Sequence, residues 1–250
     1  MDHDQDIVKP DIEENVQAGI TSTPKLTIAD LMIWTACIAA YMGIYHLIAL
    51  STDELSADTT KQLIQLGFAL SCGTATAGVI AIWKHPTATI AQLSVEPGVT
   101  LLFTIAVAGL ISVVAYCCET RINSWDGSYI NLALLVNFIK TLAIIIFIAK
   151  ALLHIAGSRW HFMLYPWLFY HVHNLLALSS YVFSIDIFDE ILPIQLIVSM
   201  IGSITVAALL VVDPLDEPNL TWLHRTGTVC LLGIYITEFS AVLYKISLNY

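Results

Sequence analysis

Ionisable side chains stand inside stretches of this sequence that are otherwise apolar. They are Lys140 in "LVNFIKTLA", His171 and His173 in "LFYHVHNLL", and Glu238 in "IYITEFSAV". Such residues can hold counter-charges for a solute, relay protons, or bind haem or a metal ion through histidine. Each is a candidate functional residue because a charge is costly in apolar surroundings. Which of these chemistries is open to them depends on the elements that position them.

Composition identifies the solvent in which those elements form. The chain has 250 residues, of which 57% are hydrophobic and only 12% are charged, and its mean hydropathy is +0.77. Soluble domains carry about 25% charged residues. The apolar runs are longer than the roughly 10-residue alternating strands of a membrane barrel. The sequence therefore predicts an integral membrane protein made of helices.

Apolar stretches long enough to cross a bilayer occur seven times. A span needs about 20 residues, and the candidate stretches are 27–50, 63–83, 98–118, 131–155, 162–184, 191–212 and 226–246. The polar segments between them are short, so consecutive helices are expected to be antiparallel neighbours. The predicted fold class is an all-α integral membrane protein, a bundle of about seven transmembrane helices.

The first 25 residues differ in composition from the rest of the chain. Much of the net charge of −10 arises here, from six acidic residues facing one lysine, namely Asp2, Asp4, Asp6, Asp11, Glu13, Glu14 and Lys9. We expect residues 1–25 to form a disordered acidic tail and residues 26–250 to form the membrane domain. An acidic tail argues against nucleic acid as a partner and against electrostatic docking on anionic lipid headgroups. The apolar stretches make the lipid bilayer the expected environment of the remaining chain.

The distribution of lysine and arginine predicts the orientation of the bundle. Six basic residues fall on the side of the N-terminus: Lys9, Lys25, Lys84, Lys150, Arg159 and Arg225. Three fall on the opposite side: Lys61, Arg121 and Lys245. Positive residues favour the cytoplasm, and tryptophans at 83, 160 and 222 accompany the basic residues as an interfacial belt does. We therefore expect the N-terminus in the cytoplasm and the C-terminus outside.

Depth along the spans brings three ionisable residues to one level. At ~1.5 Å per residue, His173 lies roughly 17 Å and Glu238 roughly 18 Å from the cytoplasmic edge. Lys140 lies roughly 14 Å from the outer edge of a ~30 Å core. Asn137 precedes Lys140 by one helical turn and can join the same network. Lys140, His173, Glu238 and Asn137 are therefore the predicted intramembrane polar cluster.

The two neighbouring histidines cannot act together on one ion. Residues two apart on a helix point about 200° apart, so His171 and His173 lie on different faces. His171 shares its face with Asn174, and these two are weaker candidates for the cluster. A b-type haem would need a second histidine at matching depth, whereas the others lie near the membrane boundaries. No metal site is expected, and haem b is kept as a cofactor to test.

A repeat of small residues and an acidic residue at the start of a span lead to two further predictions. Ala69, Gly73 and Ala77 repeat at four-residue spacing, which predicts a close helix contact. Asp30 lies at the start of the first span, where a carboxylate interacts favourably with the helix dipole.

Sequence motifs do not assign an activity. H-E-x-x-H, G-x-S-x-G, the P-loop and the dinucleotide fingerprint are all absent. Our leading interpretation is a non-enzymatic multi-pass protein whose mid-membrane polar residues organise the bundle. One alternative is a proton- or ion-coupled transporter of a small solute that uses Lys140, Glu238 and His173. A second is a membrane redox protein carrying a b-type haem.

The opening span has a recognisable pattern. "KLTIADLMIWTACIAAYMGIY", residues 25–45, resembles the opening of many bacterial polytopic membrane proteins that carry no assigned activity. In these proteins a short basic lead containing threonine is followed by Asp-Leu and an apolar span. The resemblance covers about a tenth of the chain and implies a location in the bacterial inner membrane.

Overall fold

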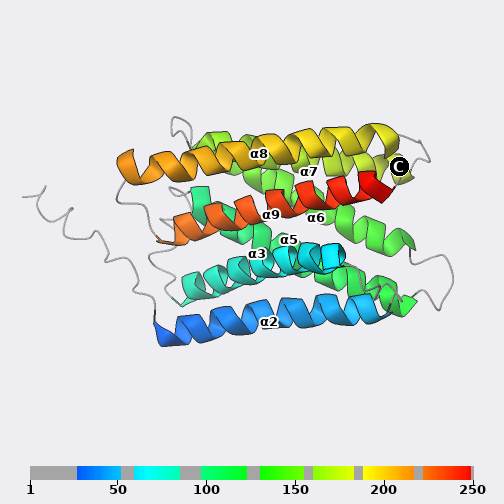
Figure 1. Ribbon diagram of the computed structural model, residues 1–250, viewed down its shortest axis with the longest axis horizontal. Coiled ribbons are helices and arrows are strands. Elements are labelled where there is room, and N and C mark those ends of the chain that lie inside the picture. Colours follow the sequence, from blue (N-terminus) through cyan, green and yellow to red (C-terminus); the bar gives the residue numbers. More distant parts are fainter. Residues whose placement is uncertain are drawn as a thin grey trace, which may run out of the picture.

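The chain folds into helices throughout the part that the structure describes. The computed structural model describes residues 27–51, 59–84, 97–122, 130–154, 160–182, 188–216 and 222–248, where no strand occurs (Figure 1). The helices are α2 (Ile28–Ser51), α3 (Thr59–Trp83), α5 (Pro97–Ile122), α6 (Ile130–His154), α7 (His161–Val182), α8 (Phe188–Asp216) and α9 (Trp222–Leu248). The predicted fold class is confirmed. The acidic tail at residues 1–25 lies outside the described residues.

Six of these helices are long and apolar enough to cross a membrane: α2, α3, α5, α6, α8 and α9. The exception is α7, which contains His171, His173 and Asn174 as well as Pro166. Its 22 residues still extend about 33 Å at 1.5 Å per residue. The architecture is that of a multi-pass membrane protein in which the most polar helix has the length of a span.

The helices follow one another around a ring. Each of α3, α5, α6, α7, α8 and α9 contacts the next, α9 closes the ring on α3, and α9 also contacts α5. α2 packs outside the ring, mainly on α3 (Figure 1). Consecutive helices are antiparallel neighbours, as the short connections predicted. α9 comes last among the described helices, and it packs against α3, α5 and α8.

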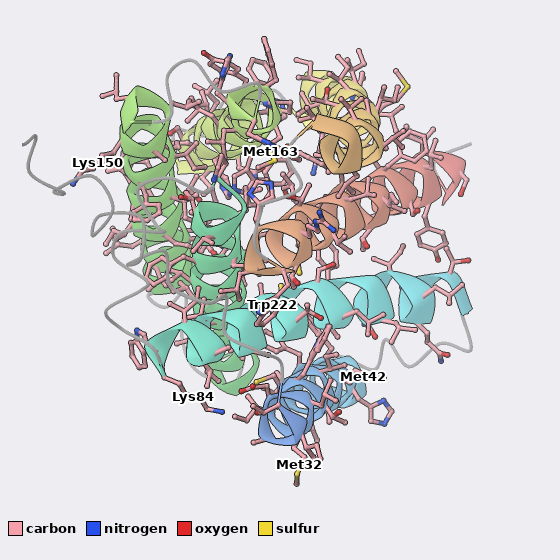
Figure 2. All side chains as sticks on the ribbon, turned by 90° about the vertical axis from the view of Figure 1, so that its left-hand side faces the viewer. Met32, Met42, Lys84, Lys150, Met163 and Trp222 are labelled. Atoms are coloured by element: carbon pink, nitrogen blue, oxygen red, sulfur yellow. The ribbon has the colours of Figure 1, made fainter. Side chains whose placement is uncertain are left out.

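An ion pair joins α2 to the residue that follows α3, at the end of the bundle where α2 begins. Lys84 Nζ lies 2.8 Å from Asp30 Oδ1. The other carboxylate oxygen, Oδ2, accepts bonds from the backbone N–H and the hydroxyl of Thr27, and the Asp30 N–H donates to Thr27 Oγ1. This reciprocal arrangement is a capping box, which satisfies N–H groups of the first turn. Asp30 therefore stabilises a helix start, as expected. Figure 2 views the bundle from this end and labels Lys84, Lys150 and Trp222 there.

Glycines set how closely the helices approach. A Cβ added at Gly73 would lie 2.7 Å from the Cα of Ile38, so α2 and α3 meet at the predicted small-residue site. At the end where α5 and α9 begin, a Cβ on Gly98 or Gly227 would overlap with the backbone of the facing helix. We refer to residues 97–104 of α5 and 222–231 of α9 as the glycine-packed end.

Candidate functional site

A cavity of about 310 Å³ lies among the helices of the ring, beyond the glycine-packed end. We refer to it as the central cavity. Six helices supply its lining: Tyr45 from α2, Phe68 and Cys72 from α3, Ile105, Ala108, Gly109 and Ser112 from α5, Lys140 and Thr141 from α6, Trp167, Tyr170, His171 and Asn174 from α7, and Ile234 and Glu238 from α9. Lys140 and Glu238, which the sequence predicted to lie at a similar depth in the membrane, thus line the same cavity.

The ammonium group of Lys140 is held by neutral oxygens. Its Nζ donates to Asn137 Oδ1 at 2.8 Å, one turn earlier on α6, and to Ser112 Oγ at 3.0 Å on α5. An ammonium has three N–H donors, so two of them have acceptors among the described residues. The bond to Ser112 joins α6 to α5. The predicted pairing of Asn137 with Lys140 is present in the structure.

The carboxyl group of Glu238 receives bonds from two other helices. The hydroxyl of Tyr170 on α7 lies 2.7 Å from Oε1, and the side-chain amide of Gln195 on α8 lies 2.9 Å from Oε2. With both oxygens accepting, the geometry suits an ionised carboxylate. The bonds also fix its direction relative to the cavity, and they tie α7 and α8 to α9.

His171 is the histidine that faces the central cavity. Its side chain is 4% exposed, and neither Nδ1 nor Nε2 has a hydrogen-bond partner among the described groups. Rings surround it instead: the centroid of Trp167 lies at 4.4 Å and that of Tyr170 at 5.3 Å, both edge-on. Buried polar atoms normally have partners. His171 is therefore a buried side chain on the cavity wall whose two nitrogens have no partner among the described groups.

Trp167 closes the cavity on the side of the glycine-packed end. It is 2% exposed, lies parallel to Tyr170 with centroids 5.4 Å apart, and donates from Nε1 to Thr104 Oγ1 at 3.4 Å. Within the glycine-packed end, His224 is fully buried, and its Nδ1 accepts the N–H of Gly98 at 3.1 Å. Trp160 meets that ring edge-on, with centroids 4.3 Å apart. The cavity therefore ends on a packed floor.

His173 lies elsewhere. It is 7% exposed, its Nε2 has no partner among the described groups, and it is not among the residues that line the central cavity. The depth count favoured His173 over His171, whereas the cavity faces His171 and Asn174. The reason is that depth along a helix contains no information on which face meets the interior. The prediction that His171 and His173 lie on different faces of the helix agrees with these positions.

A second hollow adjoins the central cavity. It has a volume of about 330 Å³ between α6 and α7 and is lined by Leu134, Asn137, Lys140, Thr141, Asn174, Ala177 and Leu178. Three of these residues, Lys140, Thr141 and Asn174, also line the central cavity. Lys140 of the predicted cluster and the weaker candidate Asn174 therefore stand at the boundary between the two hollows, and Asn137 lines the second one.

Sequence reasoning missed several partners. Tyr170, Gln195 and Ser112 hold the two charges, and none of them is unusual in an apolar span taken alone. His224 lies outside the predicted span at 226–246, yet it belongs to the first turn of α9 and accepts a bond from the facing helix. Only an expected contact between α5 and α9 could have singled it out, and those helices are far apart in sequence.

The described residues provide few ligands for a metal ion or a haem. Within the described ranges no three histidine, cysteine, aspartate or glutamate side chains gather in a way that could hold a metal ion. Of the described residues that line the central cavity, one is a histidine, His171. A haem held by two axial histidines would need a second one on the opposite wall.

Comparison of the chain with protein-family models, curated proteins and solved structures finds no match. The geometry of the cavity is therefore the basis on which a function can be inferred.

Proposed function

We propose that this multi-pass membrane protein is a transporter-like protein whose central cavity binds a small polar solute between Lys140 and Glu238. The observation that carries the proposal is that two oppositely charged side chains line one cavity together with a buried histidine whose nitrogens have no hydrogen-bond partner among the described groups. Ionisable groups inside a membrane bundle that face a cavity mark pathways for ions and solutes. Coupling to protons would use Glu238, whose protonation would change both its charge and its bonds.

The hydrogen bonds around each charge support this reading. Lys140 is held by Ser112 and Asn137, and Glu238 by Tyr170 and Gln195, all of them neutral. Neutral partners orient a charge without cancelling it. The Lys140 ammonium can therefore attract a negative charge on a solute, while Tyr170 and Gln195 orient the Glu238 carboxylate where it lines the same cavity.

Labelling of an introduced cysteine tests whether solutes reach the cavity. In a variant whose natural cysteines are replaced by alanine, Ser112→Cys places a thiol on the cavity wall beside the Lys140 ammonium, which favours the reactive thiolate. Ser199→Cys is the matched control, because Ser199 on α8 is fully buried and outside the cavity lining. We expect a water-soluble methanethiosulfonate to modify Ser112→Cys and to leave Ser199→Cys unmodified. Equal protection of the two thiols would contradict the proposal.

A second function is favoured by the same bonds: organisation of the bundle. Tyr170 and Gln195 bring α7 and α8 to Glu238 on α9, and Lys140 brings α6 to α5. Buried polar contacts of this kind can specify which helices are neighbours. If this is their whole role, Glu238→Gln will reduce the yield and melting temperature of the protein. A transport role predicts a folded protein whose solute binding is lost.

For the location we propose the bacterial inner membrane with the N-terminus in the cytoplasm. Lys84 directly follows α3, and Lys150 and Arg225 lie on α6 and α9, all at the end of the bundle where α2 begins; Figure 2 shows Lys84 and Lys150 at that end. Basic residues are retained on the cytoplasmic side. This orientation can be tested by fusing to the N-terminus a reporter that is active only in the cytoplasm. An inactive fusion would indicate the opposite orientation.

A further inference from the structure

We propose that the second hollow, between α6 and α7, binds a small monocarboxylate whose carboxylate contacts Lys140 and Asn137. This hollow lies beside the central cavity and shares Lys140, Thr141 and Asn174 with it. The inference goes beyond the proposed function, because it concerns a different hollow and names the chemical class of its ligand.

Lys140 supplies the positive charge of the site. Among the described residues that line the second hollow, it is the one with a charged side chain. Its ammonium group has three N–H donors, and the side-chain oxygens of Asn137 and Ser112 accept two of them. The third can donate to an anion in the hollow, and a charge-assisted bond of this kind is stronger than a neutral one.

Asn137 supplies further donors on the same helix. Its Oδ1 accepts from Lys140 Nζ at 2.8 Å, which fixes the orientation of the amide group. The amide nitrogen Nδ2 is bonded to the same carbon atom as Oδ1 and carries two N–H donors. The donors of Lys140 and Asn137 are therefore close enough to meet the two oxygens of one carboxylate.

The two hollows differ in how they receive an anion. Glu238 lines the central cavity as well as Lys140, so a ligand whose only charge is negative meets a carboxylate of like charge there. The described residues around the second hollow include no acidic side chain. A simple anion that binds Lys140 is therefore favoured on the side of the second hollow.

The apolar part of the lining determines the rest of the ligand. Leu134 on α6 and Ala177 and Leu178 on α7 line the hollow beside the polar residues. These side chains suit a short hydrocarbon chain, because burying apolar surface is favourable. The volume of about 330 Å³ is at the small end of the roughly 300–1,000 Å³ range of ligand sites, which favours a compact acid.

Matched ligands on the purified full-length protein test the proposal. Butyrate is compared with butyramide, which has a similar shape without the charge, and with n-butylamine, which carries the opposite charge. Sodium chloride keeps the ionic strength constant, so the effect of butyrate is measured against that of chloride. We expect butyrate alone to raise the melting temperature in a concentration-dependent way.

Variants assign the carboxylate to residues. Lys140→Met should abolish the shift that butyrate produces. Asn137→Asp keeps an oxygen that accepts from Lys140 but places a carboxylate of the protein beside the ammonium, so it should weaken butyrate binding about tenfold or more. Lys150→Met is the matched control, because Lys150 is exposed on the same helix as Lys140, and it should bind butyrate as the parent protein does.

Three results would overturn the proposal: no shift with butyrate beyond that of chloride, an equal shift with butyramide or n-butylamine, or equal butyrate binding by Asn137→Asp and Lys150→Met. Labelling of Ser112→Cys tests the central cavity independently, since Ser112 lines that cavity and is not among the described residues around the second hollow. The two proposals can therefore fail separately.

Discussion

The two halves of the bundle are built in opposite ways. At the glycine-packed end, Gly98 and Gly227 let the backbones of α5 and α9 touch, and the histidine there, His224, accepts a backbone N–H. In the other half the same helices line the central cavity, and the histidine there, His171, has no partner among the described groups. One half is closely packed, backbone against backbone, and the other is hollow with charged side chains lining the cavity. We infer that the packed half holds the bundle together while the hollow half binds the solute.

Gly227→Ala should give the largest effect on stability. The added methyl group would overlap with the carbonyl of Gly98, and helix backbones cannot yield as a flexible side chain can. We expect a loss of about 3 kcal/mol, at the upper end of overpacking effects, seen as a lower melting temperature in detergent. Gly43→Ala is the control, because nothing lies within 4 Å of its added Cβ. If both variants melt like the parent protein, the glycine-packed end is not the foundation of the bundle.

Tyr170→Phe should have the next largest effect. It removes the 2.7 Å hydrogen bond to Glu238 and leaves the ring in place. We expect a loss of roughly 1.5–3 kcal/mol, as for other hydrogen bonds to charged groups. Tyr165→Phe on the same helix is the control, since that side chain is 51% exposed. A matching loss in the control would show that the hydroxyl of Tyr170 contributes nothing specific.

Lys140→Met separates binding from bundle organisation. Methionine keeps much of the apolar stem and removes both the charge and its desolvation cost, which offsets the lost bonds to Asn137 and Ser112. We expect the melting curve to shift by the equivalent of about 1 kcal/mol or less, while ligand binding is lost. A loss of stability as large as that of Tyr170→Phe would favour an organising role.

Lys84→Met should show the smallest effect. The ion pair between Lys84 and Asp30 lies at the surface, where such pairs contribute little. We expect a slight decrease in melting temperature at low salt that disappears at 1 M salt, where the Debye length is about 3 Å. A salt-independent decrease would mean that Lys84 stabilises the end of α3 by packing and not by charge.

Much of the fold could be predicted from the sequence because hydropathy alone locates helices in a membrane. The predicted span at 98–118 lies within α5, and even the polar span at 162–184 corresponds to α7. The fixed rise of a helix also brought Lys140 and Glu238 to one level. Rotation of each helix about its axis could not be predicted, because it depends on which helices are neighbours. That is why His173 was placed ahead of His171, and why Gln195 and Tyr170 were not foreseen as partners of Glu238.

The most direct test of the account is the side from which the cavity can be reached. Ser112→Cys, in the variant without other cysteines, is exposed to a membrane-impermeant methanethiosulfonate in sealed vesicles of each orientation. Because the glycine-packed end closes the bundle on the side where α2 begins, we predict modification from the opposite side and protection from this one. Modification from the side of the glycine-packed end alone, or from neither side, would contradict the division of the bundle into a packed half and a solute-binding half.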